Sequence, residues 1–158
     1  MSGARARNES LAVSTWARIV ETHGLMLREI RRSVPPRLTV PQVDVLARLA
    51  GRNEGMTPGE LTRALLVTGG NVTGIVERLR RLGLVVRRPE PRDRRAVRVS
   101  LTPGGRRVAR RAVSRVGREV SRLLARVPAR ELVRLRDLLD LLNTQLRDAQ
   151  PPRRRRSR

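Results

Sequence analysis

Residues 56–102 read MTPGELTRALLVTGGNVTGIVERLRRLGLVVRRPEPRDRRAVRVSLT, and they contain the clearest structural signals of the chain. Its start, TPGE at residues 57–60, has the form of a capping box with proline at the first helical position, where a missing N–H costs nothing. A short helix to about Leu66 is therefore expected. After a tight turn, Thr68 can cap a second helix that ends at Gly83, a residue suited to a left-handed conformation. The spacing predicts a helix-turn-helix.

The second helix of this unit has one apolar face, and a hairpin follows it. The expected inward positions are Val72, Ile75, Val76, Leu79 and Leu82. Residues 84–88 and 96–101 are rich in β-branched side chains and predict two strands. They are separated by a charged loop at residues 89–95. The whole predicts a winged helix-turn-helix: mainly α, with a small β-hairpin as the wing.

Helices are also expected before this unit. Residues 1–9 are small, polar and basic, and are expected to be disordered. Apolar residues then recur three and four apart in a long helix within residues 10–36, which Pro35 and Pro36 end. A second capping box, from Thr39 to Gln42, starts another helix to about Ala50. Residues 37–102 are thus expected to form one domain.

Two further helices are expected in residues 103–148, the second starting at Pro128. The second has the heptad spacing of a coiled coil. Its expected interface leucines are Leu132, Leu135, Leu139, Leu142 and Leu146. Two heptads are too few to dimerise alone. Residues 103–148 and the helix of residues 10–36 are therefore assigned together to one dimerisation region. Residues 149–158 are expected to be a disordered basic tail.

The composition points to a polyanionic partner. The 158 residues carry a formal net charge of +22, and all 36 basic residues are arginine. Double-stranded DNA is the first candidate partner and an anionic membrane the second. No apolar run is long enough to span a bilayer and no secretion signal precedes residue 10, so a cytoplasmic protein is expected and no membrane partner.

Several chemistries are not expected. Cysteine is absent, which removes thiolate nucleophiles and thiolate metal ligands. His23 is the single histidine, too few for a dedicated transition-metal site. No nucleophile setting, phosphate loop or pair of acids suggests an enzyme, so no catalytic residue, metal or cofactor is expected.

Thr68 and the outward face of the helix that follows it are expected to contact DNA. Its first turn is small and polar, which permits close approach to base edges, and Asn71 can pair in bidentate fashion with adenine. Arg78 and Arg81 follow a turn or two later and would contact the backbone or guanine. In the wing, Arg94 and Arg95 are also expected to contact DNA.

Asp93 is unusual in a loop expected to bind phosphate. Its position makes sense if the carboxylate orients the guanidinium of Arg95, so that this arginine enters a narrow minor groove in a fixed pose. The alternative is that the charged loop is only a solvated surface. The preceding helix-turn-helix favours the DNA-binding interpretation.

At these residues the chain resembles the MarR family of bacterial transcription regulators. The resemblance rests on the block from Thr57 to Arg88, the DRR sequence at 93–95 and LTPGGR after the second strand, and it covers roughly residues 10–148. It implies a homodimer with two winged lobes on a pseudo-palindromic operator. It also implies which residues face the major groove: Gly70, Asn71, Thr73, Gly74 and Arg78. Arg95 would be the minor-groove arginine, with Asp93 as its partner.

The family also suggests a ligand. Trp16 and His23 lie on one face of the first expected helix, and two interpretations stay open. They are either packed residues at the dimer junction or part of a crevice that binds a small aromatic or anionic effector. The leading hypothesis is a ligand-responsive regulator, usually a repressor. The rival is an architectural, nucleoid-type DNA-binding protein without sequence preference, which competition with random DNA would distinguish.

Overall fold

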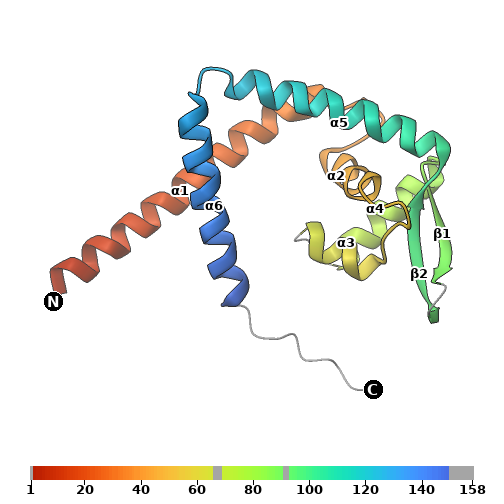
Figure 1. The fold of residues 1–158 in the computed structure, drawn as a ribbon, viewed down its shortest axis with the longest axis horizontal. Helices are drawn as coiled ribbons and strands as arrows, with labels where there is room; N and C mark the ends of the chain where they lie inside the picture. Colours follow the sequence, from red (N-terminus) through yellow and green to blue (C-terminus); the bar gives the residue numbers. More distant parts are fainter. Residues whose placement is uncertain (1, 66–68, 91–92, 150–158) are drawn as a thin grey trace. The chain divides into compact units, whose positions relative to one another are not determined.

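The structure, a computed structural model, describes residues 2–65, 69–90 and 93–149 (Figure 1). Its elements are, in order, α1 (Ser2–Ser33), α2 (Val40–Ala50), α3 (Pro58–Leu65), α4 (Gly69–Arg81), β1 (Val85–Glu90), β2 (Asp93–Leu101), α5 (Pro103–Leu124) and α6 (Ala129–Asp148). The strands pair as one antiparallel hairpin. The expected fold class, mainly α with a β-hairpin wing, is confirmed. The chain divides into two compact units, residues 1–121 and 122–158.

One hydrophobic core occupies the middle of the first unit. It is built by α2, α3, α4, the hairpin and the first half of α5, which together we call the lobe. Its buried residues are Val45, Leu46, Leu49, Met56, Leu61, Val72, Val76, Leu79, Val85, Val99, Leu101 and Ala109. Each fully buried leucine or valine contributes about 1.5–3 kcal/mol, so this cluster holds the lobe together.

Local signals place the helix starts inside the lobe as expected. The Thr57 N–H donates to Glu60 Oε2 at 2.7 Å and the Glu60 N–H donates to Thr57 Oγ1 at 3.2 Å, which is a complete capping box. At the start of α2, the Thr39 N–H donates to Oε1 of the buried Gln42 at 2.9 Å. Gly83 has a φ of +68° and ends α4, as expected.

The hairpin is longer than the sequence suggested. Residues 89–95 were expected to form a loop, but β1 continues to Glu90 and β2 begins at Asp93. Pro89 is accommodated because each strand of a two-stranded ribbon has a free edge, where a missing N–H is tolerated. The pairing becomes irregular between Pro89 and Glu90. The wing is therefore a strand ribbon, and not a long loop on two short strands.

Two other expectations were wrong. Leu82 was placed on the inward face of α4, but its side chain is 42% exposed, because α4 ends at Arg81 and the helical periodicity ends with it. Residues 1–9 were expected to be disordered, yet α1 is helical from Ser2. Extending an existing helix adds one hydrogen bond per residue and needs no new nucleus, which explains the longer helix.

The helices outside the lobe keep their apolar side chains exposed. On α1 the exposed large apolar residues are Leu11, Val13, Trp16, Ile19, Val20 and Leu25. On α6 they are Val133, Leu135, Leu138, Leu139, Leu141, Leu142 and Leu146. Although these helices are amphipathic, none of the described helices is long and apolar enough to cross a membrane.

Candidate nucleic-acid interface

Helix α4 presents two contrasting faces. Val72, Val76 and Leu79 are buried in the lobe core at helical spacing. This fixes the rotation of the helix and turns the opposite face to solvent. The exposed residues of that face include Gly70, Asn71, Thr73, Gly74, Arg78 and Arg81. The residues expected to contact the major groove are therefore brought together on one accessible surface.

Packing within the chain does not require glycine at either of the two glycine positions on this face. A Cβ added at Gly70 or Gly74 would meet no atom within 4 Å. Glycine inside a helix costs about 0.5–1 kcal/mol relative to alanine, and here no packing constraint offsets that cost. The missing side chains instead leave the α4 backbone open to close approach from outside.

The charges on α4 are not equivalent. Arg80 Nη2 and Glu77 Oε1 form an ion pair at 2.8 Å, and the hydrogen bond from Arg80 lowers the pKa of Glu77. Arg80 is therefore partly neutralised by its neighbour. By contrast, the side chain of Arg78 forms no ion pair or hydrogen bond with any described residue. It is the more available cation for a phosphate or a guanine.

Some expected contact residues cannot be placed in full. Thr68 lies outside the described residues. Asp93, Arg94 and Arg95 occupy the start of β2, at the tip of the wing, but only their backbone is described. The orienting role of Asp93 therefore stays a prediction.

The base of the wing is strapped to the start of α3. Met56 and Val99 exchange two backbone hydrogen bonds of 2.8 Å, which adds a short third strand segment to the hairpin. Arg98 Nη1 donates to the Gly55 carbonyl at 2.9 Å and lies 3.9 Å from Glu60 Oε2. We call these contacts the Arg98 strap.

Gly55 is required in this strap. Its φ is +77°, and a Cβ there would collide with the carbonyl of Val99. Sequence reasoning identified Glu60 only as a capping residue and did not identify Arg98. Arg98 precedes Val99 on an expected strand, and side chains alternate between the two faces of a strand. This alternation is the sequence feature that could have indicated Arg98.

A second junction ties α4, β1 and α5 together. Thr102 Oγ1 donates to the Gly83 carbonyl at 2.8 Å, and the Gly105 N–H donates to Thr102 Oγ1 at 2.8 Å. A Cβ at Gly105 would collide with the Leu84 carbonyl. This explains the LTPGGR sequence, since the second glycine lets α5 begin in contact with the turn after α4.

The remaining expected site residues lie outside the lobe. Trp16 and His23 on α1 are both exposed within the single chain, so neither is packed there. Of the five expected interface leucines, Leu132 is half-buried and the other four are exposed. Among the described residues, no group of three or more histidine, cysteine or acidic side chains could hold a metal ion.

An accessible helix with a small polar first turn, joined by tight junctions to a basic hairpin, defines a winged helix-turn-helix DNA-binding regulator. Comparison with known proteins agrees. Residues 38–96 match the sequence profile of the MarR family. Over these residues the chain is similar to the MarR family of transcription regulators.

Individual relatives show the extent of the likeness. A transcription regulator of the family from Rhodococcus sp. RHA1 superposes with a TM-score of 0.76 at 25% identity, over 84% of this chain and 94% of that one. CouR of Rhodococcus jostii RHA1, bound to p-coumaroyl-CoA, gives 0.72 at 26% identity, over 78% and 87%. The transcriptional activatory protein BadR of Rhodopseudomonas palustris is 41% identical over 73 residues, which is 45% of this chain and 42% of BadR.

Proposed function

We propose that the protein is a homodimer that binds a pseudo-palindromic operator sequence-specifically in the cytoplasm. Helix α4 would enter the major groove, and Arg94 and Arg95 of the wing would contact the backbone and the adjacent minor groove, with Asp93 orienting Arg95. The observation that carries this proposal is the exposed face with open glycines at Gly70 and Gly74. A protein that used only charge would not need such a face.

Dimerisation is supported by the exposed apolar faces of α1 and α6. Exposed apolar side chains gathered on one helix of a charged protein mark an interaction site, and each of these two helices carries such a set. The leucines Leu135, Leu139, Leu142 and Leu146 share heptad spacing on α6 and are exposed in the single chain. A second copy would bury them and would bring two lobes to successive turns of DNA, about 34 Å apart.

The proposed effector is a small aromatic acid or its coenzyme A thioester. CouR, which shares the fold at 26% identity, was solved with p-coumaroyl-CoA bound. Trp16 and His23 would line the crevice for the aromatic part. The effector would bind better to a dimer whose lobes have the wrong spacing for the operator. Its differential affinity for the two forms of the dimer would set how far it shifts the equilibrium between them.

The proposed sign of regulation is repression. A dimer covering a promoter blocks transcription, and binding of the effector relieves the block because the dimer then leaves the operator. BadR, which matches over part of its length, is named as an activator. A promoter fusion distinguishes the two: deletion of the gene raises expression from a repressed promoter and lowers it from an activated one.

The test of sequence-specific binding is competition. Labelled intergenic DNA upstream of the gene is bound, and unlabelled operator or random DNA is added at one fixed salt concentration, since affinity falls steeply with salt. We expect random DNA to compete at least about a thousandfold less well. Asn71→Ala should reduce this ratio, whereas Arg147→Ala on α6 should leave it unchanged.

An architectural, nucleoid-type protein is the second candidate, because a net charge of +22 alone would bind any DNA. Equal competition by operator and random DNA would support that function and overturn the sequence-specific one. Arg95→Ala provides a further check of the wing. We expect weaker operator binding with unchanged thermal stability, and unchanged affinity would contradict the wing's role.

A further inference from the structure

Arginines are concentrated in the stretch that follows the wing tip, and this stretch contains no acidic residue. From residue 94 to residue 118 the sequence contains nine arginines and no aspartate or glutamate. On α5, like charges recur at spacings of three and four, as at Arg111, Arg115 and Arg118. Such pairs destabilise an isolated helix by about 0.2–0.5 kcal/mol each. The helix keeps them although no packing requirement calls for charge there.

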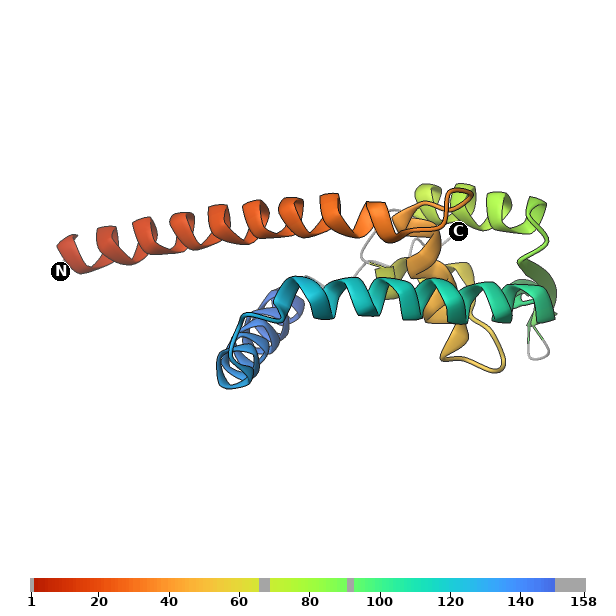
Figure 2. The same cartoon turned by 90° about the horizontal axis from the view of Figure 1, so that it is seen from above.

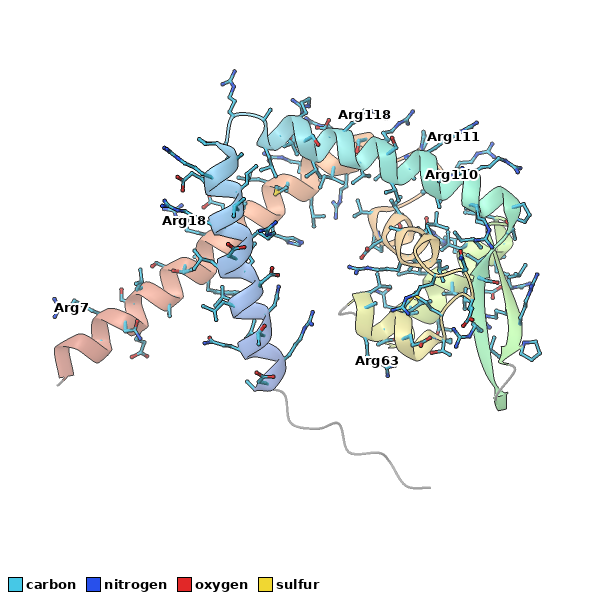
Figure 3. The ribbon with its side chains drawn as sticks, in the orientation of Figure 1. Arg7, Arg18, Arg63, Arg110, Arg111 and Arg118 are labelled. Atoms are coloured by element: carbon cyan, nitrogen blue, oxygen red, sulfur yellow. The ribbon has the colours of Figure 1, made fainter. Side chains whose placement is uncertain are left out.

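Four of these arginines line one shallow cleft of about 550 Å³. The lining consists of Arg110, Arg111, Arg115 and Arg118 with Ser114, and of Pro35 and Val108 on the apolar side. Arg118 Nη1 donates to Ser114 Oγ at 2.7 Å. Figure 3 shows Arg110, Arg111 and Arg118 following one another along α5.

Three of the four arginines of the cleft have no ion-pair partner among the described residues. Arg110, Arg111 and Arg115 have no ion pair with any described carboxylate. All three are exposed. An anion entering this cleft would therefore not have to displace an internal partner.

DNA held by α4 does not account for this cluster. Ala109 and Ala112 of α5 are fully buried, and Ala109 packs in the same core as Val72 and Val76 of α4. The exposed faces of the two helices thus point away from a shared core. Figure 2 shows α4 and α5 on opposite sides of α2. A duplex on the exposed face of α4 would not reach the cleft.

The spacing of the arginines indicates the ligand. From Arg110 to Arg118 the helix rises about 12 Å, at 1.5 Å per residue. A single carboxylate would occupy one guanidinium, whereas an extended anion with several charged groups could engage several. Guanidinium groups bind phosphate oxygens in bidentate fashion, and Pro35 and Val108 offer an apolar surface to an uncharged part. We propose that this cleft binds the diphosphate group of a nucleotide-type ligand.

Such binding would be coupled to the DNA-binding helix. Helix α5 starts at the junction where Thr102 holds the Gly83 carbonyl at the end of α4. A ligand that relieves charge repulsion along α5 therefore acts on an element fixed to α4. This regulatory consequence rests on the proposed function, but binding of the diphosphate itself does not.

Isothermal titration of the full chain with ADP, inorganic pyrophosphate and benzoate tests the site. The double variant Arg111→Gln/Arg115→Gln is compared with Arg7→Gln/Arg63→Gln, which removes the same charge from exposed positions on α1 and α3 (Figure 3). Each lost charged hydrogen bond weakens binding, so we expect ADP affinity to fall at least about tenfold in the cleft variant and less than about twofold in the control.

Tighter binding of ADP than of pyrophosphate would assign the apolar side to a nucleoside, and equal binding would assign the site to diphosphate alone. An equal loss in both variants, or tighter binding of benzoate than of ADP, would overturn the proposal. Operator affinity of both variants is measured in parallel. If operator binding is absent while ADP binding depends on Arg111 and Arg115, the proposed function fails and the cleft assignment stands.

Discussion

Large apolar side chains are buried in the lobe but exposed on the two terminal helices, α1 and α6. In the lobe, Leu46, Leu61 and Leu79 are 0% exposed. On α6, Leu138 and Leu146 are 60% and 63% exposed. The lobe therefore completes its hydrophobic core within one chain, whereas α6 does not, and α1 with its exposed Trp16 resembles α6 in this respect.

This contrast in burial separates the parts of the chain that pack by themselves from those that depend on a partner. Most helical stability in proteins comes from packing of an amphipathic face and not from intrinsic propensity. The lobe supplies that packing to α2, α3 and α4. The exposed apolar faces of α1 and α6 lack it within the single chain, and a second copy is the proposed source.

Leu79→Ala in the lobe should cost about 2–5 kcal/mol in the free energy of unfolding, because it leaves a cavity in a closed core. Urea unfolding followed by circular dichroism measures it. Leu135→Ala, in the expected interface row of α6, is the comparison variant. Its cost should depend on protein concentration, because dimerisation stabilises the chain by mass action, whereas the cost of Leu79→Ala should not. Equal concentration dependence would remove the distinction between the two regions.

The double variant Leu139→Asp/Leu142→Asp should weaken dimerisation at least about tenfold, since two charges would have to be buried unpaired. Light scattering across a dilution series gives the dissociation constant. The matched control is Asp137→Asn/Asp140→Asn, which changes charge on the same helix without adding any to the leucine row. A variant that remains dimeric would show that α6 is not part of the interface.

Arg98→Met should reduce operator affinity about three- to tenfold and stability by about 1 kcal/mol, because it removes the hydrogen bond to Gly55 from the strap. If the strap acts by positioning the wing, the losses from Arg98→Met and Arg95→Ala should not add. Arg98→Lys should restore part of the affinity. If the losses of operator affinity from Arg98→Met and Arg95→Ala add, Arg98 has a structural role only.

The smallest effect concerns the capping box of α3. The backbone hydrogen bond from Thr57 lowers the pKa of Glu60. A carboxyl whose pKa is lowered in the folded state contributes stability above its unfolded pKa of about 4.3, and this contribution is lost as pH falls through the lower folded value.

Glu60→Gln should therefore flatten the fall in stability between about pH 5 and pH 3, with a change of at most about 1 kcal/mol. Thermal unfolding at several pH values measures it, and Glu54→Gln, on an exposed residue, serves as the control. An unchanged pH profile in Glu60→Gln would mean that the capping carboxylate does not contribute to stability.

Short-range signals predicted most of the lobe. The capping box at Thr57 and the left-handed Gly83 depend on residues within a few positions, so they were found from the sequence. The inward face of α4 followed from its periodicity as far as Leu79. Leu82 was assigned wrongly because the periodic pattern carries no information on where the helix stops.

Long-range contacts could not be predicted in the same way. Arg98 and Gly55 are 43 positions apart in the sequence, and only the folded hairpin brings them together. The family resemblance drew attention to LTPGGR without giving a reason. The structure supplies it, since Gly105 lies against the Leu84 carbonyl. The cleft on α5 was missed because its arginines are indistinguishable in sequence from the other arginines of the chain.

Sedimentation equilibrium of the full chain, alone and with operator DNA, tests the division between lobe and terminal helices most directly. One chain has a mass of 17.8 kDa. We expect twice that mass at micromolar concentration, and one dimer bound to each operator. A single-chain mass that persists on operator DNA, with α1 and α6 still helical, would contradict the account.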